Sequence, residues 1–263
     1  MDGEQADQVK KDSNLSLVTK PSNAVQILTM NNSVAPLDNL KVRQAINLAV
    51  DKNVVIAGSN WGFGDPIGSH MSPADPFYAD KNNVWKTDIA KAKALLKEAG
   101  FEKGFDITLS LPQPYAIHVK AGQVIADQLK QIGINVKLET VDWGKWVKDV
   151  YTGRNYQMTV ISHTGRLDPD AMLSRYESAN KENYMNYKKI RRSTKPSKKG
   201  RTVTDKAERK KNIYASIQEQ LAKDVPAVYL QTPRTLLGTG KKVTGLETYP
   251  IDIYELSTVY LNK

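Results

Sequence analysis

Apolar residues recur along the chain with two alternating spacings, and these spacings predict a mixed α/β fold. A spacing of three and four residues is typical of an amphipathic helix, whereas alternation of apolar and polar residues is typical of a half-buried strand. The helical spacing occupies residues 40–50, 51–56, 87–99, 117–132, 143–150 and 204–223. Short apolar or alternating runs predict strands at Ser16–Val18, Ala24–Met30, Phe105–Leu111, Ile134–Leu138, Gln157–Ile161, Val225–Tyr229 and Leu256–Leu261. Because strands and helices follow one another, we expect helices packed on a sheet rather than an all-helical or all-β fold.

Capping and turn residues support these boundaries. Thr87 stands where a helix N-cap is expected, and Gly100 and Gly133 follow helical stretches as left-handed terminators. Residues 58–86 carry four glycines and three prolines, which predicts a long surface loop. Loops of that length are uncommon unless they bind something. Trp61 lies in this loop, and we expect its ring to cover a ligand or another lobe.

Composition describes an ordinary globular chain and excludes several classes of site. The 263 residues are 40% hydrophobic and 25% charged, close to the values of soluble domains. Cysteine is absent, which excludes disulfides, thiolate catalysis and cysteine-based zinc sites. No apolar run approaches the roughly 20 residues of a membrane-spanning helix. The first residues lack the apolar core of a secretory signal, so we expect a cytosolic chain or a piece of a longer protein.

The net charge of +10 is concentrated in one segment. Residues 188–211 contain twelve Lys or Arg and two acidic residues, and the rest of the chain has 26 residues of each sign. A nucleic-acid surface usually spreads its cations over a face and interleaves aromatic residues, whereas this run is linear and contains no aromatic residue. Because like charges at four-residue spacing disfavour a helix, we expect a poorly ordered, solvated loop. A nucleic-acid-binding module that uses residues 188–211 is the alternative function.

The segment His163–Asp170 is the strongest candidate site because it follows a predicted strand. In open α/β sheets, ligands bind at the carboxyl ends of strands. His163 with Asp168 and Asp170 resembles a metal site, but three such residues within eight positions arise often by chance, so we expect no metal and no cofactor. Catalysis is not expected either, because the three histidines form no HExxH pair and no GxSxG motif or phosphate-binding glycine loop is present.

Five segments carry a family resemblance. In chain order they are NNSVAPLDNLKVRQAINLAVDK, TDIAKAKALLKEAGF, VIADQLKQIGINVKLETVDWGKW, GRLDPDAMLSRY and IQEQLAKDVPAVYLQTP. Their order and spacing resemble the extracytoplasmic solute-binding proteins of peptide, nickel and related ABC importers, over nearly the whole chain. Members of that family are longer. The resemblance therefore implies the C-terminal half of such a protein: a type II periplasmic-binding-protein-like α/β lobe with hinge strands and a fragment of the first lobe.

The resemblance also implies a domain division. Residues 1–33 would be a fragment of the N-terminal lobe with a hinge strand, residues 34–230 the C-terminal α/β lobe, and residues 231–263 the return hinge and strands of the N-terminal lobe. The segments before Met30 and after Thr244 should then pair with each other or lie as hinge strands. On this division, Ala24–Met30 lies outside the sheet that contains Gln157–Ile161.

The function that the resemblance implies is transport. Two lobes would close over a peptide-like solute and deliver it to an ABC permease in the membrane, with no catalysis and no nucleic-acid partner. Such a protein would be periplasmic, or anchored at the cell surface as a lipoprotein, with its leader outside this chain.

Site residues follow from the same resemblance. In peptide-binding members, an aspartate that pairs with the ligand ammonium lies three residues before an Asp-Pro pair, and here that place is Gly165, so the anchor is missing. Asp168, at the Asp-Pro position, either contacts the solute or caps the next helix. Arg166 either holds a solute carboxylate or pairs with Asp170 on the surface. The expected ligand-binding residues are His163, Thr164, Gly165, Arg166, Asp168, Trp61 and Trp143.

Other side chains would support that loop. Asn183, Tyr184 and Tyr187 match the Asn-x-x-x-Tyr stretch of the family, where hydrogen bonds would hold the binding loop. Trp143 and Trp146 share one helical face and are expected mainly in the core, although Trp143 follows a strand end and can reach a cleft.

Overall fold

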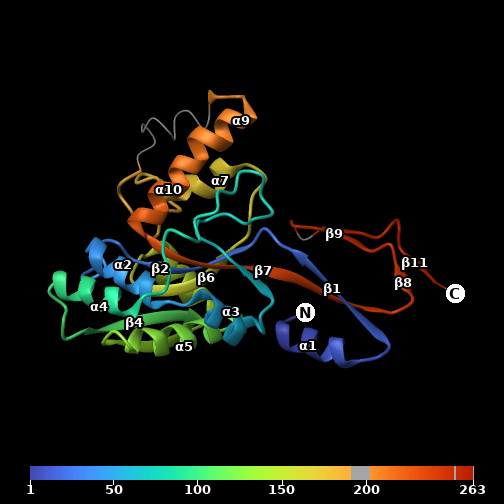
Figure 1. The fold of residues 1–263 in the computed structure, drawn as a ribbon, viewed down its shortest axis with the longest axis horizontal. Coiled ribbons are helices and arrows are strands. Elements are labelled where there is room, and N and C mark those ends of the chain that lie inside the picture. Colours follow the sequence, from blue (N-terminus) through green and yellow to red (C-terminus); the bar gives the residue numbers. More distant parts are fainter. Residues whose placement is uncertain (191–201, 252, 263) are drawn as a thin grey trace.

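A mixed sheet forms the centre of the computed structural model, which describes residues 1–190, 202–251 and 253–262 (Figure 1). Within these residues, the sheet has seven strands in the order β1-β7-β2-β6-β4-β5, and β3 pairs with β7. The strands are β1 (Leu15–Pro21), β2 (Val25–Met30), β3 (Gly64–Pro66), β4 (Phe105–Pro112), β5 (Ile134–Val141), β6 (Met158–His163) and β7 (Ala227–Gly240).

Three neighbouring strands of this sheet are parallel. β4 pairs in parallel with both β5 and β6, and helices connect them along the chain, as parallel strands require. The connection from β4 to β5 is α5 (Ala116–Lys130), and the connection from β5 to β6 consists of α6 (Trp143–Lys145) and the π-helical turn η1 (Trp146–Thr152). The carboxyl ends of β4, β5 and β6 therefore meet at one edge of the sheet.

Helices cover both faces of the sheet (Figure 1). One face packs on α2 (Leu40–Ala49), α3 (Lys52–Asn60), α4 (Ile89–Glu98) and α5. The other face packs on η1, α7 (Pro169–Leu173), η2 (Ser174–Tyr176), η3 (Arg209–Tyr214) and α10 (Ala215–Asp224), with α9 (Lys206–Glu208) at the far end. Each face has its own apolar core, and this layered arrangement is the predicted α/β fold.

The expectation for Ala24–Met30 is wrong. β2 lies in the middle of the sheet, antiparallel to β6 on one side and to β7 on the other, and all six of its residues are buried. The sequence of a strand that is buried on both faces is a nearly continuous apolar run. Such a run does not indicate to which sheet the strand belongs. The wider assignment of the chain ends to a second lobe stays a prediction.

The two chain ends form an arm that projects from the body (Figure 1). It contains β1, the second half of β7, and α1 (Gly3–Lys11), a helix that the apolar spacing did not predict. Asp2 and Gln5 cap α1 reciprocally, which explains how a polar sequence forms a helix. Beyond β7, the tail forms the small pairs β9–β10 (Glu247–Tyr249 with Ile253–Glu255) and β8–β11 (Val243–Thr244 with Tyr260–Leu261).

Other boundaries also differ from the prediction. α3 continues to Asn60, and Gly58 within it lies close to α5, where a Cβ would be 2.7 Å from a Val124 methyl. Asp88 rather than Thr87 caps α4. Gly100 and Gly133 do adopt left-handed conformations, with φ of 84° and 85°, as predicted.

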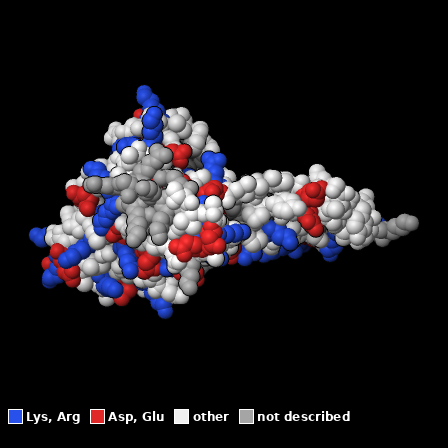
Figure 2. Space-filling model, turned by 90° about the horizontal axis from the view of Figure 1, so that it is seen from above, with Lys and Arg blue, Asp and Glu red and all other residues white. Residues whose placement is uncertain are grey.

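The basic segment is only partly described. Residues 191–201 lie outside the described residues, so the expected loop there is not tested. Lys206–Tyr214 is helical, as the apolar spacing over residues 204–223 predicted, and Asp205 begins the helix by accepting a hydrogen bond from Glu208 N. The loop expected for the basic segment therefore does not extend to residue 211. On the face in Figure 2, basic and acidic side chains are interspersed over the described part of the body.

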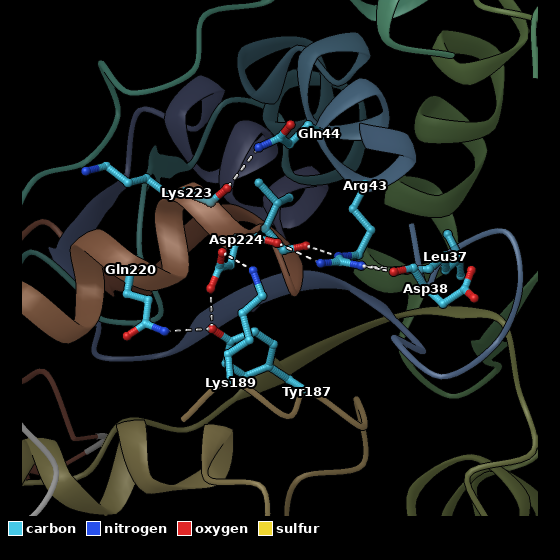
Figure 3. Close-up of polar contacts among 10 residues, drawn as sticks. Leu37, Asp38, Arg43, Gln44, Tyr187, Lys189, Gln220, Lys223 and Asp224 are labelled. Carbon is cyan, nitrogen blue, oxygen red and sulfur yellow. Dashed lines mark hydrogen bonds and ion pairs between the residues drawn. The ribbon is translucent and has the colours of Figure 1, made fainter. Parts of the chain in front are cut away.

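Arg43 joins α2 to the end of α10 (Figure 3). Its guanidinium is buried and donates to the carbonyl oxygens of Leu37, Asp38, Asp224 and Val225 at 2.8–3.1 Å. Val225 has a φ of 44° and ends α10. A cation that donates hydrogen bonds to the last carbonyl oxygens of a helix satisfies groups that have no partner inside the helix. Arg43 thus fixes the helix that covers the second face of the sheet.

Candidate functional site

The carboxyl edge of the parallel strands carries exposed aromatic rings. Tyr115 follows β4 and Trp143 follows β5, and their side chains are 41% and 40% exposed. Their rings meet edge to face with centroids 5.2 Å apart. Thr164, also exposed, follows β6. Large aromatic side chains left open at this edge are a typical lining of a binding cleft.

Trp143 and Trp146 lie side by side, but one belongs to the core and the other is exposed at the edge. Their rings stack with centroids 5.1 Å apart and an interplanar angle of 5°. Trp146 is buried, and its Nε1 donates to Thr159 Oγ1 at 2.9 Å. Trp146 is therefore a core residue, whereas Trp143 presents its outer face to solvent. Tyr115 was not predicted as a site residue, although its place directly after a strand was a usable signal.

His118 lies under this edge, on the first turn of α5. Its Nε2 lies 3.3 Å from the backbone N–H of Ser162, and its Nδ1 lies 2.9 Å from the side-chain amide of Gln26. Burial lowers the pKa of His118 from 6.5 to about 4, because a buried imidazolium loses its hydration. His118 is therefore neutral near pH 7 and ties α5 to the end of β6.

His163 ends β6, and both of its ring nitrogens are engaged within the chain. Nδ1 lies 3.1 Å from Nε2 of His70, and Nε2 lies 3.3 Å from the hydroxyl of Tyr184. Burial, with Arg175 nearby, holds the pKa of His163 well below its usual range. These bonds leave no ring nitrogen for a solute or a metal. They argue against the direct ligand contact that we expected.

The loop after His163 is packed tightly against a distant turn. A Cβ on Gly165 would lie 2.4 Å from the carbonyl oxygen of Asn23 and 2.5–2.6 Å from its side-chain atoms. Asn23 N in turn donates to Pro250 O at 3.0 Å. Glycine is thus required here by close approach, and an aspartate cannot occupy this position without moving the loop.

Arg166 projects from the same loop into a groove of about 310 Å³. The groove is lined by Asn23, Ala74, Asp75, Pro76, Arg166, Leu167, Tyr249, Pro250 and Ile251. Arg166 is exposed and makes no ion pair with any residue that the structure describes, Asp170 included. Its guanidinium remains available to a carboxylate.

Asp168 caps the helix that follows the loop. Its Oδ1 accepts a hydrogen bond from Asp170 N at 2.8 Å, and Arg209 Nη2 lies 3.2 Å from its Oδ2. The cap that we considered is therefore present. With these two partners, Asp168 is less suited to a solute than Arg166.

Trp61 lies at the end of α3 with a φ of 51° and a side chain that is 39% exposed. The ammonium group of Lys120 lies 4.0 Å above its ring, a cation–π contact. Lys120 is on α5, so Trp61 lies beside this helix, whose first residue follows Tyr115.

Asn183 and Tyr187 stabilise the segment before the basic run. Asn183 Nδ2 donates to Glu177 O and Tyr187 O, and the Tyr187 hydroxyl donates to Asp224 Oδ2 at 2.6 Å (Figure 3). They fix residues 177–187 to α10, whereas Tyr184 reaches the binding loop through His163.

The fold and its edge can be compared with known proteins. Residues 1–184 match the model of the middle part of bacterial extracellular solute-binding proteins, family 5. The chain belongs to this family. It is 30% identical to the glutathione-binding protein GsiB of Pectobacterium atrosepticum over 99% of its length, and 30% identical to the dipeptide-binding protein of Escherichia coli over 95%.

Solved structures of the family share the fold. The DppA protein of Helicobacter pylori, in complex with the peptide STSA, superposes with a TM-score of 0.82 at 27% identity and covers all of this chain. The substrate-binding protein CtaP of Listeria monocytogenes gives 0.89 at 25% identity, also over the whole chain. The chain spans about half of each of these proteins: 52% of GsiB, 48% of the dipeptide-binding protein, 52% of DppA and 55% of CtaP.

Two further structural features bear on partners. In the described ranges, no helix combines the length and apolar character that a membrane span requires. Across the same residues, no group of three or more His, Asp or Glu side chains is arranged to hold a metal ion. The segment on which the nucleic-acid alternative depends includes residues 191–201, outside the described part of the chain.

Proposed function

We propose that this chain is the C-terminal part of the solute-binding component of an ABC importer for peptide-like solutes. The observation that carries the proposal is the gathering of Tyr115, Trp143 and the loop from Thr164 at one carboxyl edge of the sheet, in a family whose relatives are named for glutathione and dipeptides. The role is binding and delivery, without catalysis.

The solute chemistry follows from the side chains at that edge. Exposed rings accept apolar or aromatic side chains of a peptide, and Arg166 is suited to a carboxylate through two parallel hydrogen bonds. Gly165 leaves the loop without a carboxylate at the position of the ammonium anchor, and Asp168 is already bonded to Arg209. We therefore favour solutes that bind chiefly through a carboxylate.

The second wall of the cleft would come from the rest of a longer protein. The tail after β7 exposes large apolar side chains: Tyr249, Ile253, Tyr254, Leu256, Tyr260 and Leu261. Such a surface is unusual on a free domain, and relatives are about twice as long as this chain. We propose that the N-terminal lobe covers this surface and that residues 1–33 and 231–263 contribute to that lobe, with β2 kept in the main sheet.

The compartment and the receiving partner follow from the family. A protein of this kind would be periplasmic, or held at the cell surface by a lipid anchor, and would present its solute to a membrane permease.

Calorimetry on the whole protein tests the proposal. Glutathione, a set of dipeptides and tripeptides, and their C-terminal amides would be titrated at moderate ionic strength. We expect binding of at least one free peptide and weaker binding of its amide, since the amide removes the carboxylate. Binding of a sugar or a nucleic acid with no binding of any peptide would overturn the proposal.

A further inference from the structure

A fully buried histidine and a half-buried one, from distant parts of the chain, share one hydrogen bond behind the candidate site. His163 Nδ1 lies 3.1 Å from His70 Nε2, and the ring centroids are 5.0 Å apart. His70 is fully buried in the long segment between β3 and α4. Neither His70 nor this contact belongs to the expected ligand-binding residues.

The pair is the middle of a longer hydrogen-bonded chain. Beyond His163, its Nε2 faces the Tyr184 hydroxyl at 3.3 Å, and Thr29 Oγ1 on β2 lies 3.1 Å further on. Beyond His70, its Nδ1 faces the Tyr176 hydroxyl at 2.6 Å. All four imidazole nitrogens thus have a partner, and the chain joins the end of β6 to three other segments.

Proton counting excludes a doubly charged pair. A neutral imidazole has one N–H and one acceptor nitrogen, so two neutral rings satisfy every bond in the chain with all hydrogens pointing the same way. Two imidazolium ions would set N–H against N–H at the shared bond. The surroundings favour the neutral rings, since Arg175 adds positive potential and burial disfavours charge.

The tyrosine hydroxyls around the pair remain uncharged near neutral pH. Burial raises the pKa of the Tyr176, Tyr184 and Tyr229 hydroxyls above their ordinary value. The ring of Tyr229, on β7, lies 6.0 Å from that of His70. Among the residues that the structure describes, the hydrogen-bond partners of the two rings are each other and two tyrosine hydroxyls, and none is a carboxylate.

The segment that carries His70 is itself anchored. Ser72 Oγ donates to Ser22 O at 2.6 Å, and Ser69 Oγ donates to Gln218 Oε1 at 2.8 Å. Ser22 precedes Asn23, the residue against which Gly165 packs. The His70 segment and the turn before β2 therefore support the loop after β6 from both sides.

We propose that His163 and His70 are positioning residues whose shared hydrogen bond sets the direction of loop 164–168 toward the solute. The inference rests on the proposed function for its consequence in binding, but the position of the loop is measurable without a solute. The loop begins directly after His163. If the His163 ring is held in place, the loop has less conformational freedom before binding, and the entropy cost of ordering it around the solute is smaller.

Two conservative substitutions of His70 separate this role from simple space filling. In His70→Gln, the side-chain amide reaches the place of Nε2 and keeps the bond to His163. In His70→Asn, the amide reaches the place of Nδ1 and keeps only the bond to Tyr176. Amide hydrogen exchange of residues 164–168, thermal unfolding and peptide affinity would be measured for both in the whole protein.

We expect His70→Gln to resemble the parent in loop exchange and in affinity. We expect His70→Asn to exchange faster in residues 164–168 and to bind about tenfold more weakly, the effect of one lost buried hydrogen bond. His163→Gln, in which the amide reaches the place of Nε2 and the bond to His70 is lost, should show the same faster exchange.

The outcomes separate this inference from the proposed function. Unchanged loop exchange in His70→Asn, or equal effects of both His70 variants at equal stability, would overturn the positioning role. Faster exchange only in His70→Asn, with no peptide bound by any variant or by the parent, would support the positioning role and reject the proposed solute class.

Discussion

Gly165 and Asn23 approach each other so closely that a Cβ on Gly165 would lie 2.4 Å from the Asn23 carbonyl oxygen. The contact joins the candidate binding loop to the turn before β2. The same turn is bonded to the tail through Asn23 N and Pro250 O. Two segments that are far from the loop in the sequence, the turn before β2 and the tail, therefore support it.

Replacement of Gly165 by alanine should displace the loop. Because the Cβ collides with backbone and side-chain atoms of Asn23, we expect a loss of about 1–3 kcal/mol in the free energy of unfolding, measured by urea titration. Gly240→Ala is the matched control, since its Cβ would meet only a Val243 methyl at 3.9 Å. Equal effects of the two substitutions would contradict the importance of the contact.

Arg166→Ala should weaken peptide binding by the whole protein. A charge-assisted pair in a partly desolvated groove is worth about 1–3 kcal/mol, which calorimetry would detect as a lower affinity. Lys93→Ala, on the exposed face of α4, should leave the affinity unchanged. An Arg166 variant that binds as tightly as the parent would remove Arg166 from the site.

Arg43→Met should destabilise the fold without touching the site. The substitution leaves four carbonyl oxygens without their buried donor, and we expect a loss of about 2–4 kcal/mol in the free energy of unfolding. Gln44→Met removes a single exposed bond to Lys223 O and should cost less than about 0.5 kcal/mol. Urea unfolding of both variants checks the difference.

Acid should destabilise the protein through His118. Its pKa is about 4 when folded and about 6.5 when unfolded, so the unfolded chain binds more protons between these values. Stability is therefore greatest above pH 6.5 and falls as the pH falls, by about 3 kcal/mol at pH 4 for this group alone. In His118→Gln, the slope of unfolding free energy against pH should decrease by about one proton. An unchanged slope would show that His118 is not buried as described.

Leu129→Ala should show that α5 packs on the sheet. Leu129 is fully buried, and loss of its side chain should cost about 2–5 kcal/mol through the cavity left behind. Leu138→Ala is the same substitution at a side chain that is 39% exposed, and its effect should be much smaller. If the Leu138 variant were the less stable of the two, the arrangement of the core would be wrong.

The parallel part of the sheet could be predicted because its signals are local. Gly100 and Gly133 end their helices in left-handed turns, and the helical spacing between Ile117 and Ile132 has only one apolar face. The order of strand, helix and strand then follows from the short connections. The same local signals indicated that the loop after β6 leaves a strand end.

The place of β2 could not be predicted in this way. Its partners are more than a hundred residues away, at Met158–His163 and Ala227–Gln231. Its two buried polar residues, Gln26 and Thr29, have partners in Gln231 and Tyr184, and such pairs are visible only once the chain is folded. For the same reason, the contact between His70 and His163, which are 93 residues apart, could not be predicted. His70 lies in a segment rich in glycine and proline, where no local pattern indicates a partner.

β7 has a mechanical consequence. The strand pairs with β2 over Ala227–Gln231 and with β1 over Arg234–Gly240, so one unbroken backbone runs from the body into the arm. No flexible linker separates the two along this strand. The short segment between the two ladders is itself paired, since Gly64–Pro66 of β3 lies opposite Gln231–Pro233. β7 is therefore a continuous hydrogen-bonded connection between the arm and the sheet, and residues 231–234 are the place where its partner changes from β2 to β1.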